Sequence, residues 1–135
     1  MKAATRVLDS YSLIAFFEAE PGAKTMVEVF RSARDSGESL LLSLVNWGEV
    51  FYITLREAGS ERAEEVASAI SSLPIDLVGP HLELTREAAR LKARGGIAYA
   101  DCFAAALAMT RNAELVTGDH EFKPLAGAIR ILWID

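Results

Sequence analysis

Four acidic residues stand where carboxylates could reach a shared site. Asp9 ends the first apolar stretch of the chain, and Asp119 follows the apolar stretch "ELVTG". Glu49 and Asp101 lie in the first turns of two predicted helices. Functional groups of open parallel sheets gather beyond the carboxyl ends of the strands, so these four carboxylates could converge there. Such a cluster of acids must take up protons or bind a cation.

Repulsion between the carboxylates determines whether the cluster takes up protons or binds a cation. Two ionised carboxylates about 4 Å apart repel each other by roughly 4 kcal/mol at an effective dielectric constant near 20. Oxygen-only ligands select hard ions such as Mg²⁺ or Mn²⁺. One or two such ions can deprotonate a water molecule, hold it in line and stabilise the leaving oxygen of a phosphodiester. We therefore favour the metal.

Each acid taken alone also has a structural interpretation. Asp9 and Asp119 are natural N-caps for a following helix, because their oxygens accept hydrogen bonds from free backbone N–H groups. Asn46 and Glu49 have the spacing of a capping box, with Asn in place of Ser or Thr. The helix dipole favours Asp101 near a helix start. However, Asp101 is followed by Cys-Phe-Ala-Ala-Ala-Leu, and a carboxylate partly buried in such a helix needs a counter-charge.

Strands alternating with helices are the elements that would position these acids. Near-continuous apolar stretches, typical of strands covered on both faces, predict strands at 5–9, 39–44, 74–79, 113–119 and 129–135. Apolar residues at helical spacing predict one helix ending near Gly37, one from Trp47 to Gly59, one that Ser60 could cap, one ended by Gly95-Gly96, and one at 99–112. This alternation predicts an α/β fold with a mainly parallel sheet.

The composition is that of one globular domain spanning residues 1–135. Hydrophobic residues make up 51% of the chain and charged residues 24%, close to globular averages. The single cysteine excludes an intramolecular disulfide and gives no support to a zinc site, which fits a reducing cytoplasm. The N-terminus is a poor signal peptide, and no apolar stretch is long enough for a membrane helix. We expect a cytoplasmic protein without a membrane segment.

The net charge argues against a nucleic-acid partner unless a cation intervenes. With 14 basic and 19 acidic residues the formal net charge is −5, whereas surfaces that bind nucleic acids are usually basic. Two divalent ions at the four acids would bring the formal charge close to zero. A phosphate substrate would then be attracted by the ions themselves.

Four motifs, in order, resemble the PIN-domain family, and most closely its VapC-type toxin ribonucleases of prokaryotic toxin–antitoxin pairs. They are "VLDSYSLIAFF" at 7–17, "VNWGEVFY" at 45–52, "YADCFAAALA" at 99–108 and "LVTGDHEF" at 115–122. The resemblance covers essentially the whole chain. It implies a three-layer α/β/α fold with a roughly five-stranded central sheet, and the activity of a Mg²⁺- or Mn²⁺-dependent endoribonuclease.

The same resemblance implies residue roles and partners. The family's catalytic and metal-binding acids would correspond to Asp9, Glu49, Asp101 and Asp119. Thr117 matches the family's usual hydroxyl residue two before the last acid, where it could contact metal water or phosphate. Ser10 matches the small hydroxyl residue that commonly follows the first Asp. Beyond the RNA substrate, members typically form homodimers and are held inactive by a VapB-like antitoxin whose C-terminal segment fills the active-site groove, often with an Arg.

Other polar and aromatic residues receive less specific interpretations. His81 and His120 are interpreted as surface turn histidines, and Cys102 as a small core residue. The basic residues that could meet RNA are Lys92, Arg94 and Lys123. For the first two, a solvated helix end with charge favourable to the dipole is at least an equal explanation. Three aromatic residues are interpreted as core with a share of dimer contact: Trp47, Phe51 and Tyr52.

Other functional classes explain the sequence less well. A catalytically inactive PIN-fold module that binds RNA or protein would not need all four acids. A phosphoacceptor receiver domain would have neighbouring acids after its first strand and a lysine after its last, and a haloacid-dehalogenase-type phosphatase would have Asp-x-Asp. Here Asp9 is followed by Ser-Tyr-Ser, and the sequence ends in "LWID". The favoured prediction is an endoribonuclease that acts as the toxin of a toxin–antitoxin pair.

Overall fold

A parallel five-stranded sheet forms the centre of the structure, a computed structural model that describes residues 5–135. The strand order is β3-β2-β1-β4-β5, and all four neighbouring pairs are parallel. The strands are β1 (Thr5–Leu8), β2 (Ser39–Ser43), β3 (Ile75–Val78), β4 (Glu114–Thr117) and β5 (Ile131–Trp133). All five predicted strands are confirmed, each somewhat shorter than the apolar stretch that predicted it.

Helices fill the connections between the strands. They are α1 (Ser10–Phe17), α2 (Ala23–Ser36), α3 (Leu44–Ala58), α4 (Ser60–Ser72), α5 (Leu82–Arg94), α6 (Tyr99–Thr110) and the 3-10 helix η1 (His120–Leu125). The helices predicted from apolar spacing correspond to α2 through α6. None of the helices within residues 5–135 combines the length and apolar character needed to cross a membrane.

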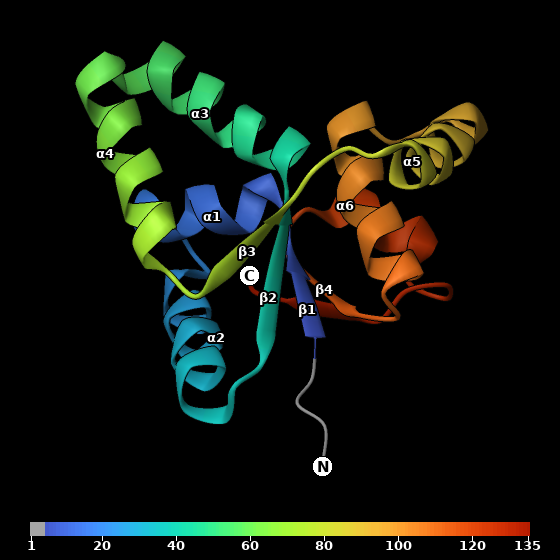
Figure 1. Cartoon of the computed structure of the whole chain (residues 1–135), viewed down its shortest axis with the longest axis horizontal. Helices are drawn as coiled ribbons and strands as arrows, with labels where there is room; N and C mark the ends of the chain where they lie inside the picture. Colours follow the sequence, from blue (N-terminus) through green and yellow to red (C-terminus); the bar gives the residue numbers. More distant parts are fainter. Residues whose placement is uncertain (1–4) are drawn as a thin grey trace.

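The helices cover both faces of the sheet. In Figure 1, α1, α2 and α4 lie to the left of the strands, and α5 and α6 lie to the right. Leu8 and Val116 pack against α1 to α4 on one face, while Val7 and Leu115 pack against α5 and α6 on the other. Successive strand residues point to opposite faces, so covering both faces requires continuously apolar strands. The predicted three-layer α/β/α arrangement is confirmed.

The strand order reverses its direction between β1 and β4. From β1 the chain proceeds outward through β2 to β3, and then crosses the sheet through α5 and α6 to β4, which pairs with β1 on its other side. Ligands of open α/β sheets bind at such a reversal of strand order, beyond the carboxyl ends of the strands. Asp9 directly follows β1, and Asp119 follows β4 after Gly118. Because β1 and β4 are parallel neighbours, the topology brings these two acids to the same end of the sheet.

Two predicted helix caps are wrong. Because β2 leads straight into α3, Ser43 is the N-cap of that helix, and its hydroxyl accepts a backbone N–H. Asn46 therefore lies inside the helix, fully buried, and does not form a capping box with Glu49. The next helix likewise starts directly after Gly59, its N-cap residue, and Ser60 makes no capping hydrogen bond.

Residues that were given structural interpretations have mixed outcomes. Cys102 is buried in α6, as predicted. His81 is the N-cap of α5 and accepts the backbone N–H of Leu84 through Nδ1 at 3.2 Å, so it is more than a surface turn residue. Trp47, in α3, is partly buried against the core, whereas Tyr52 of the same helix is half exposed, so the core assignment of Tyr52 is wrong. The predicted share of these aromatics in a dimer contact stays a prediction.

Candidate metal centre

Three carboxylates come together beyond the carboxyl ends of the strands. One oxygen from each of Asp101, Asp119 and Glu121 lies within 4.8 Å of the others. Asp101 is in the first turn of α6, whereas Asp119 and Glu121 stand at the start of η1. The group thus contains two of the four predicted site acids, and it adds Glu121, which the sequence-based prediction missed.

A local turn explains why Glu121 joins the group. Asp119 is the N-cap of η1, and its Oδ1 accepts the backbone N–H of Glu121 at 2.9 Å. Asp and Glu are both favoured at a helix start, where backbone N–H groups are free. The signal that could have identified Glu121 is therefore the pair of acids in "GDHEF", directly after a buried strand.

Asp9 is fully buried at the end of β1. Its Oδ1 accepts the N–H of Ser12 at 2.8 Å, which confirms the predicted helix cap, and its Oδ2 accepts the hydroxyl of Thr117 at 2.5 Å. The same hydroxyl accepts the N–H of Asp119 at 3.0 Å, so it links the ends of β1 and β4. Burial raises the pKa of Asp9 to about 6 and outweighs the lowering effect of the hydrogen bonds from Thr117 and Ser12.

Asp101 experiences the combined charge of the other acids. Its pKa is raised to about 7, first by burial and then by the negative charges of Asp119, Asp9, Glu49 and Glu121. Within residues 5–135, none of these five acids takes part in an ion pair. The partly buried carboxylate predicted for Asp101 is therefore present, and no basic side chain balances it.

Glu49 reaches the site from α3. Its side chain is half-buried, and its charge raises the pKa of Asp101. Glu49 and Asp9 act electrostatically on Asp101 but do not belong to the three-oxygen group. The predicted quartet is thus arranged as two acids within the group and two beside it, and its catalytic and metal-binding roles stay a prediction.

The donor atoms fit a hard divalent cation. Oxygens on opposite sides of a Mg²⁺ ion stand about 4.2 Å apart, because each Mg²⁺–O distance is about 2.1 Å. The three carboxylate oxygens lie within 4.8 Å of one another, so adjustments of the side chains would be needed to bring them onto one ion. A set of oxygen donors alone selects Mg²⁺ or Mn²⁺ over softer metals. A cation at this position would also relieve the repulsion that raises the pKa of Asp101.

The two predicted hydroxyl residues are buried beside the acids. The hydroxyl of Ser10 donates to the carbonyl oxygen of Asn46 at 3.3 Å and accepts its side-chain amide at 3.2 Å. Thr117 is engaged with Asp9 and with the backbone of Asp119. In this arrangement both hydroxyls hold parts of the site in place, and a contact of Thr117 with metal water or phosphate stays a prediction.

The predicted RNA-facing basic residues differ in their surroundings. Lys92 donates its ammonium group to the carbonyl oxygen of Ile97 at 3.1 Å, which ties the end of α5 to the loop before α6. Arg94 is exposed in the last turn of α5, and Lys123 is exposed in η1. Lys92 thus has a structural role at a helix end, whereas the other two side chains project from the surface.

Aromatic side chains border the acids. His120 stacks on Trp133, with ring centroids 4.9 Å apart and an interplanar angle of 8°, and it pairs with Asp135. This hydrogen bond lowers the pKa of Asp135. Tyr11 lies against Gly118, where a Cβ atom would come within 2.4 Å of the tyrosine Cε1. His120 is exposed, as predicted, but its ring is held in place.

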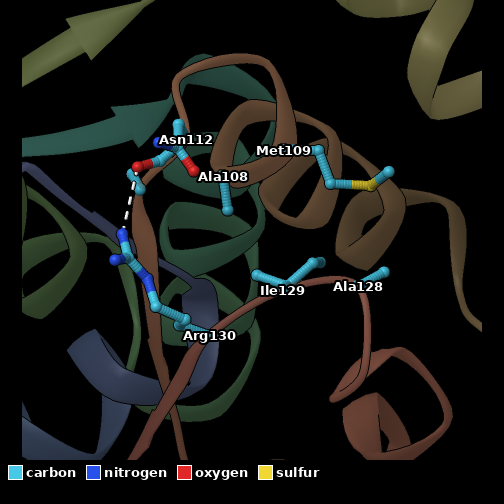
Figure 2. A pocket seen from close by; sticks show the side chains of 7 residues that line it. Ala108, Met109, Asn112, Ala128, Ile129 and Arg130 are labelled. Carbon is cyan, nitrogen blue, oxygen red and sulfur yellow. Dashed lines mark hydrogen bonds between the residues drawn. The ribbon is translucent and has the colours of Figure 1, made fainter.

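A separate hollow of about 260 Å³ lies at the amino ends of β4 and β5, away from the acids (Figure 2). It is lined by Ala108, Met109, Asn112, Ala113, Ala128, Ile129 and Arg130. Its one charged side chain, Arg130, donates to the carbonyl oxygen of Asn112 at 3.1 Å, as the dashed line shows. No carboxylate lines this hollow, so it is not part of the candidate metal centre.

Comparison with known families agrees with the fold and with the sequence motifs. The model of the PIN domain family matches residues 6–128, which is most of the chain. The chain belongs to the PIN domain family. Among curated proteins, none matches it significantly. The resemblance that the four motifs carry is thereby confirmed at the level of the family.

Solved structures share this PIN fold over nearly the whole chain. VapBC2 from Rickettsia felis, bound to a promoter DNA fragment, has a TM-score of 0.75 at 17% identity, covering 97% of this chain and 99% of that chain. DNA-bound VapBC from Salmonella typhimurium has a TM-score of 0.74 at 18% identity, covering 98% and 99%. VapC20 from Mycobacterium tuberculosis, a sarcin–ricin loop cleaving toxin, has a TM-score of 0.72 at 16% identity, covering 92% and 96%. At these identities the likeness establishes the fold.

Proposed function

We propose that this PIN domain is a Mg²⁺- or Mn²⁺-dependent endoribonuclease that acts as the toxin of a toxin–antitoxin pair. The observation that carries the proposal is the cluster of carboxylates beyond β1 and β4, in which oxygens of Asp101, Asp119 and Glu121 lie within 4.8 Å of one another. Burial, and then the negative charges of the neighbouring acids, raise the pKa of Asp101 to about 7. Membership of the PIN family supports a nuclease. The similar folds of VapBC and VapC20 support the toxin role.

The proposed residue roles follow from the arrangement of the acids. The residues that would hold the cation or complete its acidic surroundings are Asp9, Glu49, Asp101, Asp119 and Glu121. A bound divalent cation supplies the acidity that makes water a nucleophile at neutral pH and the positive charge that stabilises the leaving oxygen. Thr117 keeps Asp9 and the backbone of Asp119 in register, and Ser10 anchors the start of α1 against α3.

The biological part of the proposal concerns partners and location. We expect the domain, taken as residues 1–135, to work in the cytoplasm as a homodimer on RNA, and to be inhibited by a VapB-like antitoxin. Similar folds occur in toxin–antitoxin complexes such as the one from Klebsiella pneumoniae, which supports an antitoxin partner. Induction of the protein should arrest growth, and co-expression of a VapB-like antitoxin encoded beside it should relieve the arrest.

RNA cleavage by the purified protein tests the catalytic part. The parent should cleave RNA with Mg²⁺ or Mn²⁺ and stop when EDTA is added. Asp9→Asn and Asp101→Asn should each lose more than about 100-fold in rate, because even residues outside the ligand set of a metal site contribute 10–100-fold. Asp76→Asn is the matched control, since Asp76 is an exposed acid on β3.

The outcomes separate the main proposal from its alternative. If Asp9→Asn and Asp101→Asn cleave as fast as the parent, the acids are not catalytic. If the parent binds RNA or protein but cleaves RNA with neither Mg²⁺ nor Mn²⁺, a catalytically inactive PIN-fold binding module is favoured instead. Loss of activity in Asp76→Asn as well would point to a general effect of removing negative charge.

A further inference from the structure

Asn46 is a buried side chain at which three helices meet. It lies in α3 with no exposed surface. Its amide nitrogen donates to the hydroxyl of Ser10 at 3.2 Å and to the carbonyl oxygen of Ala100 at 3.0 Å. Ser10 opens α1, and Ala100 lies in the first turn of α6. One amide group therefore connects α3 to both other helices.

The residues that this amide connects stand next to the site acids in the chain. Ser10 directly follows Asp9, and Ala100 directly precedes Asp101. Asn46 itself is three residues before Glu49, almost one helical turn away on α3. The hydrogen bonds of one buried side chain thus join the three segments that supply these acids.

We propose that Asn46 is a positioning residue that holds Asp9, Glu49 and Asp101 in the arrangement needed to bind a divalent cation. This role rests on the proposed function, since it concerns the same site. Asn46 acts through the backbone and the neighbouring residues of the acids, and it is not itself a ligand.

The chemistry of the Asn side chain suits this role. An amide nitrogen carries two hydrogens, and here each has an acceptor on a different helix. The contact with Ser10 is reciprocal, because the Ser10 hydroxyl donates to the backbone carbonyl of Asn46 at 3.3 Å. Buried hydrogen bonds of this kind, made to two different helices, favour one arrangement of the elements that they join.

Stability alone does not explain an asparagine at this position. Its Oδ1 is buried and has no hydrogen-bond partner within residues 5–135. Burying an unpaired acceptor is unfavourable, and an apolar side chain of the same shape would avoid that cost. The benefit of the amide therefore lies in the two segments that it holds.

Such a link matters because the acids repel one another. Oxygens of Asp101, Asp119 and Glu121 lie within 4.8 Å of one another, and none of these acids is in an ion pair within residues 5–135, so ionised carboxylates here repel each other before a cation arrives. The hydrogen bonds of Asn46 resist this separation through the backbone. Residues that orient metal ligands in this indirect way typically contribute 10–100-fold to metal affinity.

Mn²⁺ binding to the full chain, measured by electron paramagnetic resonance of the free ion, tests the role without using activity. Asn46→Leu keeps the shape of the side chain and removes both hydrogen bonds, so its Kd for Mn²⁺ should rise by about 10–100-fold. Thr54→Val is the matched control. Thr54 is buried on the same helix, but its hydroxyl bonds only to the carbonyl oxygen of Val50 within α3, at 2.8 Å, so Thr54→Val should bind Mn²⁺ like the parent.

A second variant covers the case in which Asn46→Leu does not fold. Asn46→Ser keeps a polar group, but its single donor hydrogen cannot serve Ser10 and Ala100 together. Its Mn²⁺ affinity should fall between those of the parent and Asn46→Leu. In cleavage assays, either folded variant should lower kcat and leave the KM for RNA unchanged, because position 46 is buried.

The results distinguish failure of this inference from failure of the proposed function. If the parent binds Mn²⁺ and folded variants at position 46 bind it equally well, the positioning role is wrong and the metal site stands. If Thr54→Val weakens binding as much as Asn46→Leu, the effect is a general loosening of α3, and the role is again wrong. A parent that binds no Mn²⁺ would overturn both the role and the proposed metal-dependent function.

Discussion

Burial of Asp9 should make the metal-free protein less stable as the pH rises from about 4 to about 7. The pKa of Asp9 is raised from 3.8 to about 6 in the folded protein. Between these values the folded state binds more protons than the unfolded state, and stability therefore falls with increasing pH. The stabilisation of the folded state by protonated Asp9 is fully present below the pKa of the unfolded state. It is lost once the pH has risen above the pKa of Asp9 in the folded state.

The size of the effect follows from the shift. One pKa unit corresponds to 1.36 kcal/mol, so Asp9 alone should account for about 3 kcal/mol from well below its unfolded pKa to well above its folded pKa. Asp101, whose pKa is raised to about 7, acts in the same direction. Its contribution is smaller than its shift suggests, because its carboxylate is only partly buried and is screened by water. A divalent cation should oppose the trend, since it binds the ionised carboxylates.

Urea unfolding between pH 4 and 8, in EDTA, measures this dependence in the parent and in Asp9→Asn. The asparagine can still accept the N–H of Ser12, so the helix cap is kept while the ionisable group is removed. The free energy of unfolding of Asp9→Asn should fall by about 2.5 kcal/mol less than that of the parent over this range, because part of the effect is already lost at pH 4. Asp76→Asn, an exposed control on β3, should follow the parent. Parallel curves for the parent and Asp9→Asn would refute the assigned effect of burial.

Two further substitutions test the packing around the end of β4. Thr117→Val removes the hydroxyl that donates to Asp9 and accepts the N–H of Asp119. It should destabilise the protein by about 1–3 kcal/mol in urea unfolding. Thr117→Ser keeps the hydroxyl and should retain most of the stability, and an equal loss in both variants would contradict the hydrogen-bond explanation. Gly118→Ala places a Cβ atom 2.4 Å from Cε1 of Tyr11 and should cost about 1–3 kcal/mol. In a Tyr11→Ala background that cost should disappear, and its persistence would show that the clash is not the cause.

The sheet could be predicted because the burial of both of its faces determines which residues its strands contain. Leu40, Leu41 and Leu42 are consecutive in β2 and all buried, since helices cover both faces. A strand with one face in water would have alternated polar and apolar residues instead. The ends of the strands were less well predicted, because apolar residues such as Ile134 continue past the last ladder pair and pack in the core.

Asn46 shows why a local pattern can give the wrong role. Its spacing to Glu49 matches a capping box, and nothing nearby in the sequence contradicts that prediction. The hydrogen bonds that decide its role are made to residues 36 and 54 positions away, on helices whose packing depends on the whole sheet. A residue whose partners are distant in the chain has no local signal, so only the structure could reveal this contact.

The acids were partly predictable for a related reason. The carboxyl ends of parallel strands lie at one edge of a sheet, so Asp9 and Asp119 could be placed at the same edge from the sequence. The geometry of the turns decides which carboxylate oxygens lie within 4.8 Å of one another. Glu121 belongs to this group, whereas the buried carboxylate of Asp9 is bonded to Ser12 and Thr117 instead. The burial that makes Asp9 costly to ionise also excludes water, which would otherwise screen the repulsion among the acids. Repulsion among these acids should therefore both destabilise the metal-free protein and favour binding of a divalent cation. A variant with less repulsion should be more stable without metal and should bind the cation more weakly.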